Sequence, residues 1–97
     1  MDEGNGVIFL TTKTKMSDVD ISKFYMIIGA VETELDWATS NHGKFHSMHE
    51  AYAVLLEEVD ELWDVIKSHR GDERKEAVQV AAVAIRFIMD FCMEVKR

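Results

Sequence analysis

Five acidic residues lie close together in the middle of the chain and are the part of the sequence best suited to chemistry. They fall within eight residues: Glu57, Glu58, Asp60, Glu61 and Asp64. On a helix, Glu58 and Glu61 share a face with β-carbons roughly 5–6 Å apart, where like charges repel unless a cation or solvent intervenes. Mg²⁺ prefers oxygen ligands and keeps several waters, so two or three carboxylates can hold it. A solvated acidic helix face is the alternative interpretation of the same pattern.

A further acidic residue, Glu76, follows the next glycine, and a helical hairpin would bring it back to the first group. Gly71 interrupts the helical pattern, and a loop of about four or five residues there makes the flanking helices antiparallel. With the turn near residue 70, Glu61 lies at the height of residue 79, within one helical turn of Glu76. The spacing therefore predicts that Glu58, Glu61 and Glu76 approach one another.

Helices are the elements that must position these acids. The 97 residues include no proline and five glycines, so long helices meet little local resistance. We predict an all-α fold, an antiparallel helical bundle of three main helices with a four-helix core completed by dimerisation. A single compact chain of this length buries only about two-thirds of its surface, which favours a second copy. Residues 1–16 are predicted to form an N-terminal arm, and residues 17–97 a single domain. Residues 6–14 of the arm are strand-like in composition. Two alternatives stay open for it: pairing of residues 7–10 across subunits, and disorder.

The first and third helices are bounded by capping residues. Ser17 or Asp18 begins the first helix, which is expected to run to about Thr39. Asp72 is expected to cap the third helix, which is apolar nearly all round. An apolar surface of that kind predicts a central helix covered on both sides.

The second helix carries the clearest pattern. Ser47 and Glu50 form a capping box, in which each side chain is expected to satisfy the other's backbone donor. Apolar residues then recur every three or four positions and predict one buried stripe: Met48, Tyr52, Leu55, Val59, Leu62 and Ile66.

Composition narrows the classes of partner. The chain has 18 acidic against 11 basic residues and a net charge of −7, which argues against nucleic-acid binding because that affinity rests on Lys and Arg. No apolar run is long enough for a membrane span, and the acidic, polar residues 1–6 do not resemble a signal peptide, so a cytoplasmic location is expected. The single cysteine, Cys92, is expected to be a buried small hydrophobe.

The acidic motifs resemble a known family. The sequence Glu57-Glu58-Val-Asp-Glu61, a spacer of 14 residues and then Glu76-Ala-Val-Gln79 is similar to the MazG-like all-α nucleoside triphosphate pyrophosphohydrolases, in particular small phage-type and bacterial members. Residues 45–91, about half the chain, carry the likeness. Members of this family hold Mg²⁺ with Glu-Glu-x-x-Glu on one helix and Glu-x-x-Asp on the next.

The resemblance implies roles for individual residues. Glu58, Glu61 and Glu76 are the expected ligands of Mg²⁺, or of Mn²⁺ in its place, and Glu57 is expected to orient or deprotonate water. Gln79 stands where the family has Asp, so it offers one uncharged oxygen and is a conditional ligand. Glu73, three residues before Glu76, is a second choice for the missing acid. Water would attack the α-phosphorus and release a nucleoside monophosphate and pyrophosphate.

Substrate contacts are predicted at three residues. Lys75 lies beside the proposed site, among the cations that flank the turn, and a triphosphate needs such cations. Trp37 is the aromatic residue expected nearest the nucleotide, with Lys44 close behind it in the chain. Three histidines nearby, His42, His46 and His49, are expected to be surface or substrate-contacting residues in preference to zinc ligands.

Two classes of function stay open. The first is the Mg²⁺-dependent hydrolase of nucleoside triphosphates, acting as a homodimer or homotetramer in nucleotide metabolism. The second is a non-catalytic helical module, for nucleotide binding or oligomeric interaction, that has lost the fourth metal carboxylate at Gln79.

Overall fold

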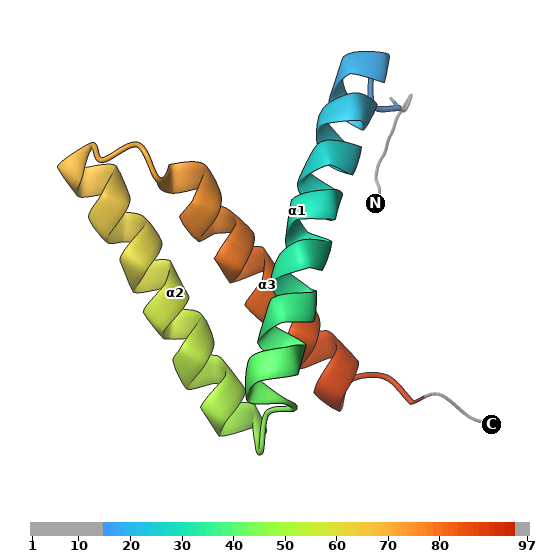
Figure 1. Cartoon of the computed structure of the whole chain (residues 1–97), viewed down its shortest axis with the longest axis vertical. Coiled ribbons are helices and arrows are strands. Elements are labelled where there is room, and N and C mark those ends of the chain that lie inside the picture. Colours follow the sequence, from blue (N-terminus) through green and yellow to red (C-terminus); the bar gives the residue numbers. More distant parts are fainter. Residues whose placement is uncertain (1–14, 95–97) are drawn as a thin grey trace, which may run out of the picture.

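The computed structural model describes residues 15–94, which form three helices and no strands (Figure 1). The helices are α1 (Asp18–His42), α2 (Met48–Ser68) and α3 (Glu73–Phe91). Within the described residues α3 packs against both other helices, whereas α1 and α2 do not contact each other. The all-α prediction and the central position of α3 are confirmed; the antiparallel bundle and its four-helix core completed by a second copy stay predictions. The strand-like residues 6–14 lie outside the described residues.

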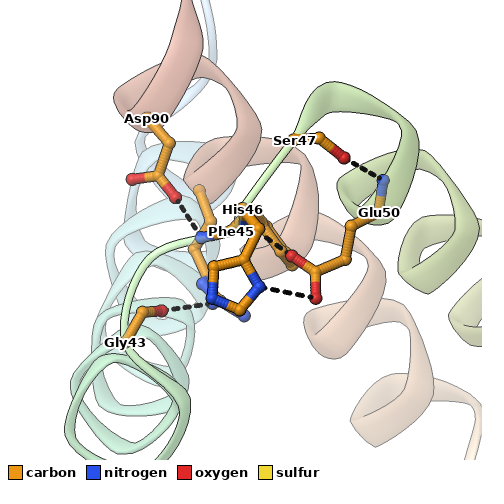
Figure 2. A network of polar contacts seen from close by, with 7 residues as sticks. Gly43, Phe45, His46, Ser47, Glu50 and Asp90 are labelled. Atoms are coloured by element: carbon orange, nitrogen blue, oxygen red, sulfur yellow. Dashed lines mark hydrogen bonds and ion pairs between the residues drawn. The ribbon is translucent and has the colours of Figure 1, made fainter.

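Serine side chains begin the first two helices. Ser17 Oγ accepts from the backbone N–H of Asp20 at 3.1 Å, and Ser47 Oγ accepts from that of Glu50 at 3.0 Å. Glu50 also reaches back, but its carboxylate accepts from the backbone N–H of His46 at 2.6 Å, one residue before the donor that the capping box predicts (Figure 2). Two backbone donors are satisfied at the start of α2, as they are in a regular capping box.

Asp72 occupies the equivalent position before α3 but makes no capping hydrogen bond with its side chain. The two sites therefore make a matched pair. We expect Ser47→Ala to lower the free energy of unfolding by about 1 kcal/mol, because an amide donor loses its partner. Asp72→Ala should cost only a few tenths of a kcal/mol, from the lost charge at the helix N-terminus. Urea denaturation of both variants measures the difference, and equal losses would contradict the assignment.

The loop between α1 and α2 is fastened to α3. α1 continues to His42, beyond the expected end near Thr39, and stops where Gly43 takes a positive φ of 69°. Arg86 Nη2 then donates to the Gly43 carbonyl at 2.8 Å, and the Phe45 N–H donates to an Asp90 carboxylate oxygen at 3.1 Å (Figure 2). These bonds hold the start of α2 against the C-terminal half of α3.

The core of the single chain is small. The buried apolar side chains are Val31, Ala38, Ala51, Val65, Ala82 and Val83. The predicted stripe on α2 divides: Leu55 and Leu62 are half-buried against α3, but Met48, Tyr52, Val59 and Ile66 are exposed. The prediction that these six residues form one buried face was therefore wrong. α2 packs against α3 through the side that carries Ala51 and Val65.

The C-terminal end of α3 is less covered than its composition predicts. Ile88 and Met89 are exposed, although the apolar surface predicted cover on both sides. Cys92 is also exposed, so its predicted burial was wrong. The reason is local, since α3 ends at Phe91 and Cys92 is its C-cap, where the chain leaves the helix. Among residues 15–94, no helix combines the length and apolar character that a membrane span requires.

Candidate metal centre

Three carboxylates from α2 and α3 meet in the helical hairpin. Each of Glu58, Glu61 and Glu76 offers an oxygen, and these three oxygens all lie within 4.8 Å of one another. Glu58 and Glu76 are half-buried and Glu61 is exposed. A short turn between the two helices makes this possible. α2 ends at Ser68, its C-cap His69 takes the left-handed conformation with φ 55°, and α3 starts at Glu73. The structure thus brings together the three glutamates that the sequence predicts.

Gln79 is half-buried and lies beside the same cluster. With its amide nitrogen turned toward the acids, it can donate to Glu58 Oε1 and to Glu76 Oε1, both at 3.1 Å. An amide N–H can thus bridge two carboxylates that would otherwise repel each other at close range. To ligate a cation, the amide would instead present its oxygen to the cluster, an orientation without these two hydrogen bonds.

Burial and neighbouring charges raise the pKa of the Glu58 carboxyl above its ordinary value of 4.5. Partial burial is the largest cause, followed by the negative charges of Glu61, Glu76, Glu34 and Glu57. Glu34 comes from α1 and was not singled out in the sequence. α1 therefore also contributes negative charge near Glu58, and no motif spacing in the sequence could indicate this.

The raised pKa gives the metal-free protein a defined pH dependence. A carboxyl whose pKa is higher in the folded than in the unfolded chain favours folding at low pH, and this contribution is lost as pH rises from 4.5 through the folded-state pKa. We expect Glu58→Gln to increase the free energy of unfolding at pH 7 in chelator, with the gain shrinking toward zero below pH 4.5.

Chemical denaturation of both proteins across this pH range checks the expectation. Asp60→Asn, on the exposed side of the same helix, is the matched control for loss of one negative charge. A Glu58→Gln effect that is the same at every pH, or one that Asp60→Asn reproduces, would contradict it.

The donor set fits a hard divalent cation. Oxygens around Mg²⁺ lie about 2.1 Å from the ion, so opposite ligands are about 4.2 Å apart and neighbouring ones about 3 Å apart. The spread of up to 4.8 Å among the three glutamate oxygens closes to these values with small side-chain rotations. Carboxylates also suit Mg²⁺ or Mn²⁺ better than the softer metals that histidine and cysteine select.

A cavity of about 450 Å³ lies beside the N-terminal end of α3. Arg74 and Lys75 supply positive charge to it, and Glu34 lines the opposite wall from α1. None of Glu58, Glu61 and Glu76 lines this cavity, so the contact of Lys75 with phosphate stays a prediction. Glu57 and Glu73 do not belong to the three-glutamate cluster.

The other predicted substrate residues lie elsewhere. Lys44 lines two cavities at the far end of α3, so it does not share an opening with Lys75. Trp37 is exposed and stacks edge-on against His42, with ring centroids 5.3 Å apart. Neither residue is brought to the glutamate cluster in the single chain.

The histidines form no cluster of their own with two further metal-ligating side chains in the part of the chain that the structure describes. His46 instead pairs with Glu50, with His46 Nδ1 3.6 Å from Glu50 Oε2. The three-glutamate cluster is the group within residues 15–94 that could hold a metal ion.

Comparison with known proteins adds no family to this description, because no protein-family model, curated protein or solved structure matches the chain. The class that fold and site define is an all-helical protein with a cluster of three carboxylates in a helical hairpin.

Proposed function

We propose that this chain is a Mg²⁺-dependent nucleoside triphosphate pyrophosphohydrolase, which converts an NTP or dNTP to the monophosphate and pyrophosphate. The observation that carries the proposal is the convergence of Glu58, Glu61 and Glu76 from two helices within 4.8 Å. These are the residues that the resemblance of the motifs to the MazG-like family assigns to the metal.

Each residue has a defined task in this proposal. Glu58, Glu61 and Glu76 hold the cation, which would supply positive charge to the phosphate oxygens. Glu57, one residue before the cluster, orients or deprotonates the attacking water. Lys75, with Arg74 in the same cavity, binds the phosphate chain, because a triphosphate needs more positive charge than one ion supplies.

A second candidate function rests on Gln79. In the orientation that donates to Glu58 and Glu76, its amide would stabilise the cluster without any cation. This favours a non-catalytic helical module in which a former metal site has become a structural polar contact. Such a module would bind Mg²⁺ weakly and would turn over no triphosphate, although it could still bind a nucleotide.

Pyrophosphate release from a panel of ribo- and deoxynucleoside triphosphates separates the two functions. The panel is run with Mg²⁺, with Mn²⁺ and with chelator. Metal-dependent release supports the hydrolase. Thermal stabilisation by a nucleotide without product supports the binding module, since a ligand that binds only the folded state raises its stability. No release and no stabilisation would contradict both nucleotide functions.

We also propose that the protein acts as a homodimer, or as a homotetramer built from such dimers. α2 exposes an outer stripe of five large apolar residues spaced by four and three positions: Tyr52, Leu56, Val59, Trp63 and Ile66. This spacing is that of a helix–helix seam. The N-terminal half of α1 exposes Ile21, Phe24 and Ile28 as well. The stripe on α2 is unusually apolar for the surface of a monomer and supports a second copy as its cover.

Sedimentation equilibrium tests the assembly. The native chain should sediment with at least twice the mass of one copy. The double variant Leu56→Glu and Val59→Glu should shift it to the monomer, because charges cannot be buried in an apolar seam without large cost. Ala53→Glu, outside the outer stripe, is the control. A native monomer would contradict the proposal.

A further inference from the structure

A cavity of about 500 Å³ lies between the C-terminal halves of α1 and α3 and is closed at one end by the loop after α1. It contains none of the three clustered glutamates. Arg86, which lines it, is ten residues beyond Glu76 on α3, so the two sites are separated by about 15 Å along the helix. The cavity has the size typical of small-molecule sites and is independent of the proposed hydrolase centre.

Arg86 is the unusual residue of this cavity. It is a cation with only 7% of its surface exposed. Its guanidinium lies 4.1 Å from the centre of the Phe45 ring and donates through Nη2 to the Gly43 carbonyl. No carboxylate among residues 15–94 forms an ion pair with it, and the nearby Asp90 accepts from the Phe45 N–H instead (Figure 2). A buried cation that no carboxylate among the described residues pairs with directly is costly, and an anionic ligand would reduce that cost.

The groups around Arg86 define the kind of anion. Lys44 lines the same cavity and adds a second positive charge at the end closed by the loop. Leu35 and Met89 supply apolar walls. Three acids line the cavity as well. Asp36 and Glu32 lie one and two helical turns further up α1 from Ser40 at the outer end, and Asp90 of α3 already accepts from the Phe45 N–H. These acids repel a ligand with several negative charges, whereas a single charge can stay at the inner, cationic end.

We propose that this cavity binds a small monocarboxylate with an apolar tail. The carboxylate pairs with the guanidinium of Arg86 and with the ammonium of Lys44, and the tail lies against Leu35 and Met89. Arginine suits this role because its planar group presents several N–H donors to the two oxygens of a carboxylate.

Three probes that share one alkyl chain test the charge of the ligand: hexanoate, hexanol and hexylammonium. Each is titrated into the ¹⁵N-labelled full chain, and backbone amide shifts are followed by NMR. Hexanoate should shift the amides of residues 39–44 and 86–90 with a Kd on the order of 1 mM. Hexanol should bind at least about tenfold more weakly, because it lacks the charge-assisted hydrogen bonds.

Variants locate the binding. Lys44→Ala should weaken hexanoate binding about fivefold, as expected for an exposed charge. Arg86→Lys should weaken it at least about tenfold, because an ammonium cannot reproduce the guanidinium fork. If Arg86→Lys fails to fold by circular dichroism, Lys44→Glu replaces it and should abolish hexanoate binding. Lys67→Ala is the control, since Lys67 is an exposed lysine of α2 near Asp64 and should leave binding unchanged.

Four results would overturn the proposal. They are tighter binding of hexylammonium than of hexanoate, hexanoate shifts that fall outside these two segments, and no shift up to about 20 mM hexanoate, some twentyfold above the expected Kd. The fourth is a shift of the same amides with protein concentration alone, which would mean that a second copy fills the cavity.

Discussion

Replacing Glu61 by Gln is expected to reduce Mg²⁺-dependent pyrophosphate release at least about a hundredfold. Glutamine keeps the shape of the side chain but removes one of the three charges that converge within 4.8 Å. Glu61 is the exposed member of the cluster, so the substitution leaves the packing of α2 on α3 intact. The loss should therefore appear in metal-dependent turnover while the helical content measured by circular dichroism stays unchanged.

Two comparisons make this result specific. Asp60→Asn removes one charge from the neighbouring position, which lies outside the cluster, and should leave turnover within about twofold of the native rate. Raising the Mg²⁺ concentration should partly restore Glu61→Gln, because the defect is in holding the cation. Full activity in Glu61→Gln would rule out the proposed metal role, and an equal loss in both variants would indicate a general electrostatic effect.

Activity and stability are expected to move in opposite directions in this hairpin. Removing the charge of Glu58 should stabilise the metal-free fold at neutral pH, because burial and four neighbouring carboxylates raise the pKa of that group. The same change should abolish metal-dependent activity if the cluster holds the cation. A cluster of acids that destabilises the metal-free protein but is required for metal-dependent activity is typical of a binding site. A stripe of acidic residues that binds no ligand would not show both effects.

The sequence predicts the helices well because the local signals at their ends agree with the apolar spacing inside them. Ser17 and Ser47 cap α1 and α2 as expected, and Gly43 provides the positive φ at which α1 ends. What local signals cannot predict is which side of a helix faces its neighbour. On α2 the small residue Ala51 allows close approach to α3, so the large Tyr52 turns outward.

The candidate site likewise has features that residue spacing predicts and features that depend on how the helices pack. Counting residues across the turn predicts that Glu61 and Glu76 meet, because a helical hairpin fixes heights along the two helices. The position of α1 depends on packing and on the ties between the loop after α1 and α3, so sequence spacing could not predict that Glu34 acts on Glu58. For the same reason, residue spacing could not predict that Lys44 and Lys75 line different cavities.

Restoring the acid with Gln79→Asp is expected to produce two opposite changes in one protein. In chelator the variant should melt at a lower temperature than the native chain, because two hydrogen bonds to Glu58 and Glu76 are replaced by repulsion between carboxylates. In saturating Mg²⁺ the order should reverse, with Mg²⁺ affinity raised about tenfold by the additional charged ligand. Calorimetry with and without Mg²⁺ measures both changes.

Gln79→Ala separates charge from hydrogen bonding in this experiment. It loses the amide bridge but adds no carboxylate, so it should melt lower than the native chain in chelator and should show no gain in Mg²⁺ affinity. If Gln79→Asp binds Mg²⁺ no better than Gln79→Ala, residue 79 does not face the cation, and the cluster works with three carboxylates alone. Activity that appears only in Gln79→Asp would instead identify the native chain as the non-catalytic module, since one charge would then separate a polar structural contact from a working metal site.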